Sequence, residues 1–175
     1  MTPKRARKAK AARKPARKAA PKAAALIEVM VQSPRWKKQP RAAAIVRNAV
    51  AAAAKAASIK PELAIVLTDD SRIRTLNREW RGFDKPTNVL SFPAANTRDA
   101  GSLGDVIIAF QTVAREAKEE GKPIKHHLAH LAVHGFLHLL GYDHETDRDA
   151  RKMERLEVEI LKGLGVPDPY AEEAS

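Results

Sequence analysis

Residues 124–140 form the longest run of apolar residues at helical spacing in the chain, IKHHLAHLAVHGFLHLL. Pro123 suits the first turn of such a helix, because its missing N–H would have no partner there. Gly141 directly follows the last periodic residue, and glycine is typical of a helix end. We therefore expect residues 124–140 to form a helix that other elements cover at the centre of the fold.

The rest of the body reads as short strands and helices in mixed order, without internal repeats. Short β-branched runs bounded by turn residues predict strands, and apolar residues at helical spacing predict helices. The fold class is therefore expected to be α+β, a small mixed four-stranded sheet packed with about five helices, of which the central one is buried. The expected strands are 26–31, 62–68, 88–92 and 103–109, and the expected further helices are 41–57, 69–81, 111–120 and 146–161.

The chain has 175 residues, enough for one ordinary domain. Residues 1–25 hold ten Lys or Arg side chains and no acid, whereas residues 26–175 hold 22 bases and 21 acids. The first segment has little apolar surface to bury and repels itself, so we expect a disordered basic arm. Its composition is consistent with binding to nucleic-acid phosphates and with a solubilising tail. It fits a transit peptide less well. The folded domain is expected over 26–165, with a C-terminal tail at 166–175.

The composition excludes several kinds of site and location. The chain contains no cysteine, so disulfides, thiolate zinc sites and cysteine nucleophiles are excluded, and a bound metal would need histidine or oxygen ligands. No apolar run approaches the roughly 18 residues of a membrane helix, and Met1 does not begin a secretory signal. We therefore expect a cytoplasmic protein that does not enter a membrane.

The sequence HGFLHLLGYDH at 134–144 carries the clearest chemical signal. His134 and His138 lie four residues apart, so a helix places both imidazoles on one face. Gly141 then permits a left-handed turn that lets His144 approach from another direction. Three nitrogens around an open fourth position are typical of a catalytic zinc ion. The sequence therefore predicts one zinc ion, or another divalent metal, held by His134, His138 and His144.

The other histidines of the same predicted helix are His126, His127 and His130. A single histidine on such a helix is usually packed or exposed, so we interpret these three as structural. His130 lies one turn before His134, which leaves open a hydrogen bond that supports the metal ligands.

One class of zinc proteases has the same histidine spacing, with a glutamate after the first histidine as general base. Gly135 occupies that position here. A glycine cannot accept a proton, so a metallohydrolase acting on peptides or small molecules is only an alternative.

The residues resemble the YbeY-type endoribonuclease family over about residues 26–165. The resemblance rests on HGFLHLLGYDH, on LNREWRGFDKPTNVLSFP at 76–93 and on GDVII at 104–108. It implies a zinc-dependent endoribonuclease domain that cuts single-stranded RNA, acts in the maturation of the 3′ end of 16S rRNA and takes part in ribosome quality control. It implies RNA and the small ribosomal subunit as partners. It also implies zinc binding by the three histidines and a functional role for Arg81.

Arg81 could clamp a scissile phosphate with its planar guanidinium, or it could form an ion pair with Asp84 or Asp105. Asp105 itself could orient a ligand histidine or Arg81, or simply form a turn. The region 35–85 carries 12 bases and 5 acids, which favours a polyanionic partner.

Three aromatic side chains, those of Trp36, Phe83 and Phe92, suit stacking on unpaired bases, although packing in the core is the commoner role of such residues. Asn88 either contacts substrate or belongs to a turn. The residues do not decide whether water or the RNA 2′-hydroxyl attacks. A second alternative is a non-catalytic, zinc-containing RNA-binding factor of ribosome assembly.

Overall fold

A computed structural model describes residues 25–95 and 101–171, so the predicted arm lies outside the described residues except for Ala25. Across these residues, no helix is both long enough and apolar enough to cross a bilayer. The elements follow one another as β1 (Leu26–Val31), η1 (Pro34–Lys38), α1 (Ala42–Ala56), β2 (Glu62–Thr68), α2 (Asp70–Arg81), β3 (Val89–Pro93), β4 (Ser102–Ala109), α4 (Phe110–Glu119), α5 (Ile124–Leu139) and α6 (Asp147–Gly163).

The four strands form one sheet in the order β1-β2-β4-β3. β1 pairs with β2 in parallel, β2 pairs with β4 in parallel, and β3 pairs with β4 antiparallel. Helix α1 supplies the crossover that a parallel β1–β2 pair requires. The predicted α+β class with a small mixed sheet is therefore confirmed.

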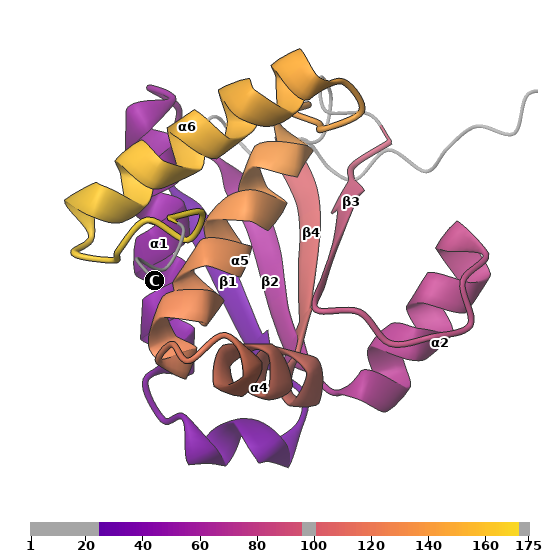
Figure 1. The fold of residues 1–175 in the computed structure, drawn as a ribbon. Helices are drawn as coiled ribbons and strands as arrows, with labels where there is room; N and C mark the ends of the chain where they lie inside the picture. The colour runs from indigo at the N-terminus through magenta and orange to yellow at the C-terminus, as the bar shows by residue number, and fades with distance from the viewer. Residues whose placement is uncertain (1–24, 96–100, 172–175) are drawn as a thin grey trace, which may run out of the picture.

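The helices cover the two faces of this sheet unequally (Figure 1). Helix α5 contacts β3 and β4 and also α1, α4 and α6, whereas α2 contacts β4 from the other face. Side chains of β4 alternate accordingly, because successive residues of a strand point to opposite faces. Val106 and Ile108 join the large core with α5, and Ile107 and Ala109 join the smaller cluster with α2. The expectation of a central, buried helix over 124–140 is confirmed.

Gly135 lets α5 lie directly on the sheet. A Cβ atom there would lie 2.7 Å from Cγ1 of Val106 and 3.2 Å from Oγ of Ser91. The Ser91 hydroxyl in turn donates a 2.8 Å hydrogen bond to the Gly135 carbonyl. The residue that replaces the protease glutamate is thus a point of close contact between α5 and β3, with no room for any side chain.

The helix ends follow the sequence signals. The Asp69 side chain accepts a hydrogen bond from the Arg72 N–H at the start of α2, and Gly82 ends α2 with a φ of 77°. At the start of α6, the Thr146 side chain accepts from the Asp149 N–H. These capping contacts satisfy N–H groups that have no partner inside the helix.

The short η1 helix was not expected from the sequence. Ser33 accepts a hydrogen bond from the Arg35 N–H, and the turn buries Trp36. The Trp36 indole N–H donates to the Thr68 carbonyl at 2.8 Å, and its ring meets Phe110 edge-on. Trp36 is therefore a core residue rather than a base-stacking one.

Strand β3 forms one edge of the sheet. Its bonds to β4 alternate along the strand, and the Asn88 carbonyl accepts one of them, at 3.0 Å. The polar groups of Val89 and Ser91 consequently face outward. The Val89 N–H donates to the Asn88 side chain at 2.7 Å, and the Ser91 carbonyl accepts from Arg81 at 2.8 Å. Pro93 has no N–H to offer, so two outward groups of this edge are bonded and one N–H is absent.

Candidate metal centre

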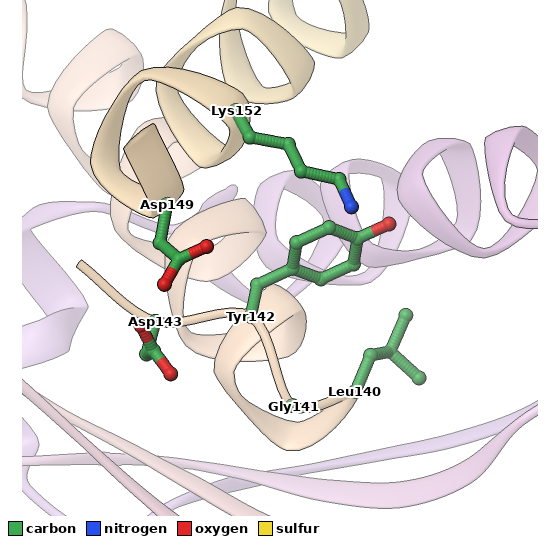
Figure 2. A pocket seen from close by; sticks show the side chains of 6 residues that line it. All are labelled: Leu140, Gly141, Tyr142, Asp143, Asp149 and Lys152. Atoms are coloured by element: carbon green, nitrogen blue, oxygen red, sulfur yellow. The ribbon is translucent and has the colours of Figure 1, made fainter. Parts of the chain in front are cut away.

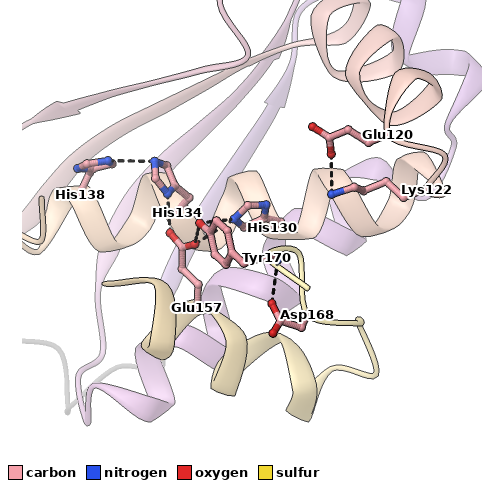
Figure 3. Close-up of polar contacts among 8 residues, drawn as sticks. All are labelled: Glu120, Lys122, His130, His134, His138, Glu157, Asp168 and Tyr170. Carbon is pink, nitrogen blue, oxygen red and sulfur yellow. Dashed lines mark hydrogen bonds and ion pairs between the residues drawn. The ribbon is translucent and has the colours of Figure 1, made fainter. Parts of the chain in front are cut away.

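The structure brings the three predicted metal ligands together at the C-terminal end of α5. Each of His134, His138 and His144 offers a ring nitrogen, and these nitrogens all lie within 4.8 Å of one another. The Nε2 atoms of His134 and His138 are 3.0 Å apart (Figure 3). The His144 ring stacks on that of His134 with 5.8 Å between centroids. Two of the rings are half-buried and that of His144 is exposed, so the group opens to solvent.

A glycine turn returns the chain to the helix end. Gly141 has a φ of 95°, in the left-handed region that favours glycine. Asp143 then accepts a hydrogen bond from the Glu145 N–H at 3.2 Å, which fixes the turn around His144. Asp143 therefore has a local structural role beside the third histidine.

Glu157 of α6 lies under the histidines, and its side chain is fully buried with 0% exposure. One carboxylate oxygen is 2.5 Å from Nδ1 of His134, and the other is 3.0 Å from Nε2 of His130 and bonded to the Tyr170 hydroxyl (Figure 3). Burial alone would raise the pKa of Glu157, but hydrogen bonds from His130, His134 and Tyr170 lower it to about 2. Glu157 is therefore an ionised acceptor at neutral pH.

This carboxylate decides which nitrogen of His134 carries the proton. An ionised carboxylate only accepts hydrogen bonds, so we assign the proton of His134 to Nδ1 and a lone pair to Nε2. Burial, together with His134 and His144, lowers the pKa of His138, against a backbone hydrogen bond with Tyr142 that raises it. Neutral imidazoles with converging lone pairs are the state in which histidine binds a metal.

The geometry fits a tetrahedral zinc ion. Zn–N bonds of about 2.0–2.1 Å place two ligand nitrogens about 3.3 Å apart, close to the observed 3.0 Å between His134 and His138. At that distance two lone pairs alone would repel each other, so either a proton on one nitrogen or a cation between them is needed. Among the described residues, this group contains three histidines and no fourth protein ligand, so it could hold an ion with an open position.

His130, His134 and Glu157 form a second group of closely spaced ligand atoms. Its 2.5 Å separation between His134 and Glu157 is that of a hydrogen bond. An ion bonded to both atoms at about 2.0–2.2 Å would hold them farther apart. The second group therefore supports the first, as carboxylates do for histidine ligands of metals, and His130 has the supporting position that the sequence left open.

Sequence reasoning missed Glu157 and Tyr170. The signal for Glu157 was present, because it shares the buried face of α6 with Met153, Ile160 and Leu161. An acid among apolar residues at helical spacing indicates a buried partner. Tyr170 follows α6 in the segment predicted as a tail, where its hydroxyl reaches Glu157 and its ring meets His130 edge-on at 5.4 Å.

Arg81 lies at the end of α2, exposed to solvent. Its Nη2 donates to the Ser91 carbonyl at 2.8 Å, and its guanidinium lies over the Phe92 ring at 5.5 Å. Ser91 also bonds to Gly135, the residue after His134. Ser91 therefore links Arg81 to the turn of α5 that carries the candidate metal ligand.

The ion pairs considered for Arg81 are not formed within the described residues. Asp84 instead pairs with Arg74 at 2.9 Å and with Arg78 at 3.5 Å. Asp105 is exposed on β4, and partial burial of its carboxyl raises its pKa. The Asn88 amide donates to Glu116 at 3.2 Å while its oxygen holds the start of β3. Asn88 therefore serves the local structure.

A solvent-open hollow of about 260 Å³ lies beside the loop that leads to His144 (Figure 2). Lys152 of α6 reaches over the Tyr142 ring, with 5.8 Å between its Nζ and the ring centroid. The hollow does not include the three histidines themselves. Its lining is Leu140, Gly141, Tyr142, Asp143, Asp149 and Lys152.

The fold and these contacts define a small α+β protein with a candidate three-histidine metal centre supported by a buried glutamate. Comparison with known proteins narrows this class. The chain belongs to the Endoribonuclease YbeY family, whose family model matches residues 30–165.

Relatives named Endoribonuclease YbeY match most of the chain. The relative from Bradyrhizobium diazoefficiens is 55% identical over 157 residues, covering 84% of this chain and 86% of that protein. The relative from Rhodopseudomonas palustris (strain BisB18) is 56% identical over 155 residues, covering 83% of this chain and 92% of that protein. The solution structure of TM1509 from Thermotoga maritima aligns with a TM-score of 0.46 at 22% identity, covering 84% of this chain and 100% of that one.

Proposed function

We propose that this protein is a zinc-dependent endoribonuclease that cuts single-stranded RNA. His134, His138 and His144 hold the ion, and Arg81 binds the scissile phosphate. The observation that carries the proposal is the convergence of three histidine nitrogens within 4.8 Å at a solvent-open helix end. The names of the relatives supply the nuclease activity and its RNA substrate.

The protein's own residues prepare the site for an anionic substrate. Glu157 holds the proton of His134 on Nδ1, so that Nε2 faces the ion position. When bound, zinc supplies a Lewis acid that polarises a phosphoryl oxygen and makes water more acidic. A cationic centre with an open position suits a phosphodiester, whose charge grows in the transition state.

Arg81 supplies the second positive group. A guanidinium has five N–H donors in a fixed plane, and its bond to the Ser91 carbonyl fixes its direction while using only one of them. The remaining donors match the oxygens of a phosphate. Ser91 contacts both Arg81 and Gly135, the residue after His134, which supports the proposal that Arg81 and the ion act on one substrate.

We further propose that the RNA is 16S rRNA, that the cut matures its 3′ end, and that the protein acts with the small ribosomal subunit in ribosome quality control. The support is the family membership and the surplus of bases over residues 35–85. This role belongs in the cytoplasm. The basic segment 1–25 would add contacts to phosphates that do not depend on sequence.

Two alternatives make different predictions. A non-catalytic assembly factor would keep its metal saturated with protein ligands, whereas the present group offers three among the described residues. A peptidase of the related spacing would need a glutamate at Gly135, where even a Cβ atom would lie 2.7 Å from Val106. The observed packing therefore disfavours the peptidase alternative.

The test measures metal content and RNA cleavage together. Purified wild-type protein should contain about one zinc ion per chain by elemental analysis and should cut a short unstructured RNA. His138→Ala should lose both, Arg81→Glu should lose cleavage but keep the metal, and the control His126→Ala should keep both. Equal cleavage by the wild type, His138→Ala and Arg81→Glu would overturn the proposal.

A further inference from the structure

Two large aromatic side chains are exposed on one short stretch of the chain. Trp80 at the end of α2 is 68% exposed, and Phe83 in the following loop is 59% exposed. Trp80 lies on the same helical face as the buried Ile73 and Asn77, seven and three residues after them, respectively. α2 stands out from the sheet beside its β3 edge (Figure 1). Trp80 therefore continues the inward-facing side of α2, but no other part of the described domain covers its ring.

Cations and a third ring accompany these aromatics. The Trp80 ring meets that of Phe92 edge-on, with 6.1 Å between centroids, and the Arg81 guanidinium lies over Phe92 at 5.5 Å. The Lys85 ammonium lies over the Phe83 ring at 5.7 Å. Rings and positive charges therefore alternate along this surface, which consists of Trp80, Arg81, Phe83, Lys85 and Phe92 and which we call the α2 platform.

The loop of the platform is held in place. Asn77, which is buried in α2, donates to the Lys85 carbonyl at 2.9 Å. Asp84 accepts two hydrogen bonds from Arg74, at 2.9 and 3.2 Å. These bonds fix both sides of the loop, so the exposed ring of Phe83 is presented without a large entropy cost on binding.

The positive charge of the platform indicates which kind of ligand it can bind. Two acids adjoin the platform in the sequence: Asp84 is already paired with Arg74 and Arg78, and Glu79 is exposed on α2. Within the described residues, neither Arg81 nor Lys85 forms an ion pair, so both positive charges are available. An occupant must combine negative charge with flat apolar groups, and unpaired nucleotides have both, since each offers a phosphate and a base with a π face.

We propose that the α2 platform binds unpaired bases of single-stranded RNA by stacking on Trp80 and Phe83, next to the phosphate held by Arg81. This inference rests on the proposed function, because it names how the same site selects its substrate. Bases of a duplex are stacked on their neighbours and cannot lie on Trp80. The platform therefore gives the nuclease its preference for single strands.

The test uses the full-length, metal-loaded protein and a 2′-O-methylated oligoribonucleotide of unstructured sequence, whose length is checked after each titration. Trp36 is buried and Trp80 is exposed, so stacking should quench the fluorescence of Trp80 alone. Trp80→Ala should raise the Kd from labelled-RNA anisotropy by about 5- to 150-fold, the range covered by one base stacked on an aromatic side chain. Trp80→Phe keeps a ring and should bind nearly as well as wild type, without the quenching.

Control measurements separate stacking from charge and from folding. Val31→Ala removes an exposed apolar side chain from β1, at the opposite edge of the sheet, and should not change the Kd. Thermal melting of each variant should match wild type, because Trp80 is mostly exposed. The slope of log Kd against log salt should be unchanged in Trp80→Ala, since no charge is removed.

The proposal is overturned if Trp80→Ala binds the single strand as tightly as wild type, or if wild type binds a duplex of the same sequence equally well. It is also overturned if Trp80→Ala weakens only the binding of a protein partner and leaves the Kd for RNA unchanged. The proposed function fails separately. If the 2′-O-methylated strand quenches Trp80 and binds tightly, yet unmodified RNA of the same sequence is never cut, the platform stands and the nuclease activity does not.

Discussion

Replacing Glu157 with glutamine is the sharpest test of the buried hydrogen-bond network. The two side chains have the same shape, but glutamine offers one acceptor oxygen and one NH2 group instead of two oxygens. If the NH2 group faces His134, the proton of that histidine must move to Nε2, where it blocks metal binding. If the NH2 group faces His130 and Tyr170, their hydrogen bonds to Glu157 are lost.

The size of the effect follows from the ionisation of Glu157. Its pKa falls from an ordinary 4.5 to about 2 in the folded protein, which corresponds to a stabilisation of about 3 kcal/mol for the ionised form over the neutral one. Glutamine resembles the neutral form. Glu157→Gln should therefore lower the free energy of unfolding of the metal-free protein by about 3 kcal/mol at pH 7.

The pH dependence has a definite sign. Because the folded-state pKa lies below the unfolded-state value, the stabilisation is complete above about pH 4.5 and is lost as the pH falls toward 2. The difference between wild type and Glu157→Gln should therefore shrink to about 1 kcal/mol at pH 3.

Urea unfolding of the chelator-treated proteins, followed by circular dichroism, measures this difference. Competition with a zinc chelator measures the second effect, a 10- to 100-fold loss of metal affinity of about the size found when a supporting carboxylate is removed. Glu159→Gln, an exposed change on the same helix, should alter neither quantity. Wild-type stability and metal affinity in Glu157→Gln would refute the reasoning.

Three further changes test other parts of the structure. Gly135→Ala should lower the free energy of unfolding by about 1–3 kcal/mol, because the new Cβ atom would lie 2.7 Å from a methyl group of β4. The control in the same thermal melts is Gly163→Ala, whose new Cβ atom would have no neighbour within 4 Å. Tyr170→Phe removes one hydrogen bond to Glu157 and should weaken zinc binding in chelator competition, in the same direction as Glu157→Gln but less, whereas unchanged affinity would assign the hydroxyl no role there. Deleting residues 1–25 should make RNA binding weaker and less dependent on salt with the metal content intact, and an unchanged salt dependence would contradict a phosphate-binding arm.

Local signals in the sequence predicted most of the elements and the proximity of the three histidines. Asp69, Gly82 and Thr146 mark helix ends in the sequence and cap the helices in the structure. The spacing of His134 and His138 fixes their common face, because helix geometry depends only on neighbouring residues. The glycine turn that returns His144 is equally local.

Contacts between distant segments were not predictable in the same way. The position of β4 between β2 and β3 depends on pairings across many residues. Glu157 meets His134 only because α6 packs on α5, and Trp80 is exposed because α2 runs beyond the sheet edge, although its helical spacing indicates an inward side chain. The Ser33 cap of η1 lies in a segment that reads as a loop.

The bond between Arg81 and the edge of β3 bears on solubility as well as on the proposed activity. An unprotected edge strand is a template on which a second chain can add a strand, and proteins block such edges with charged side chains and proline. Arg81 covers the Ser91 carbonyl, and Pro93 offers no N–H on the same side. Removing the arginine therefore also opens this edge to strand addition between molecules, so loss of activity in an Arg81 variant is informative only when light scattering shows that the variant is still monodisperse.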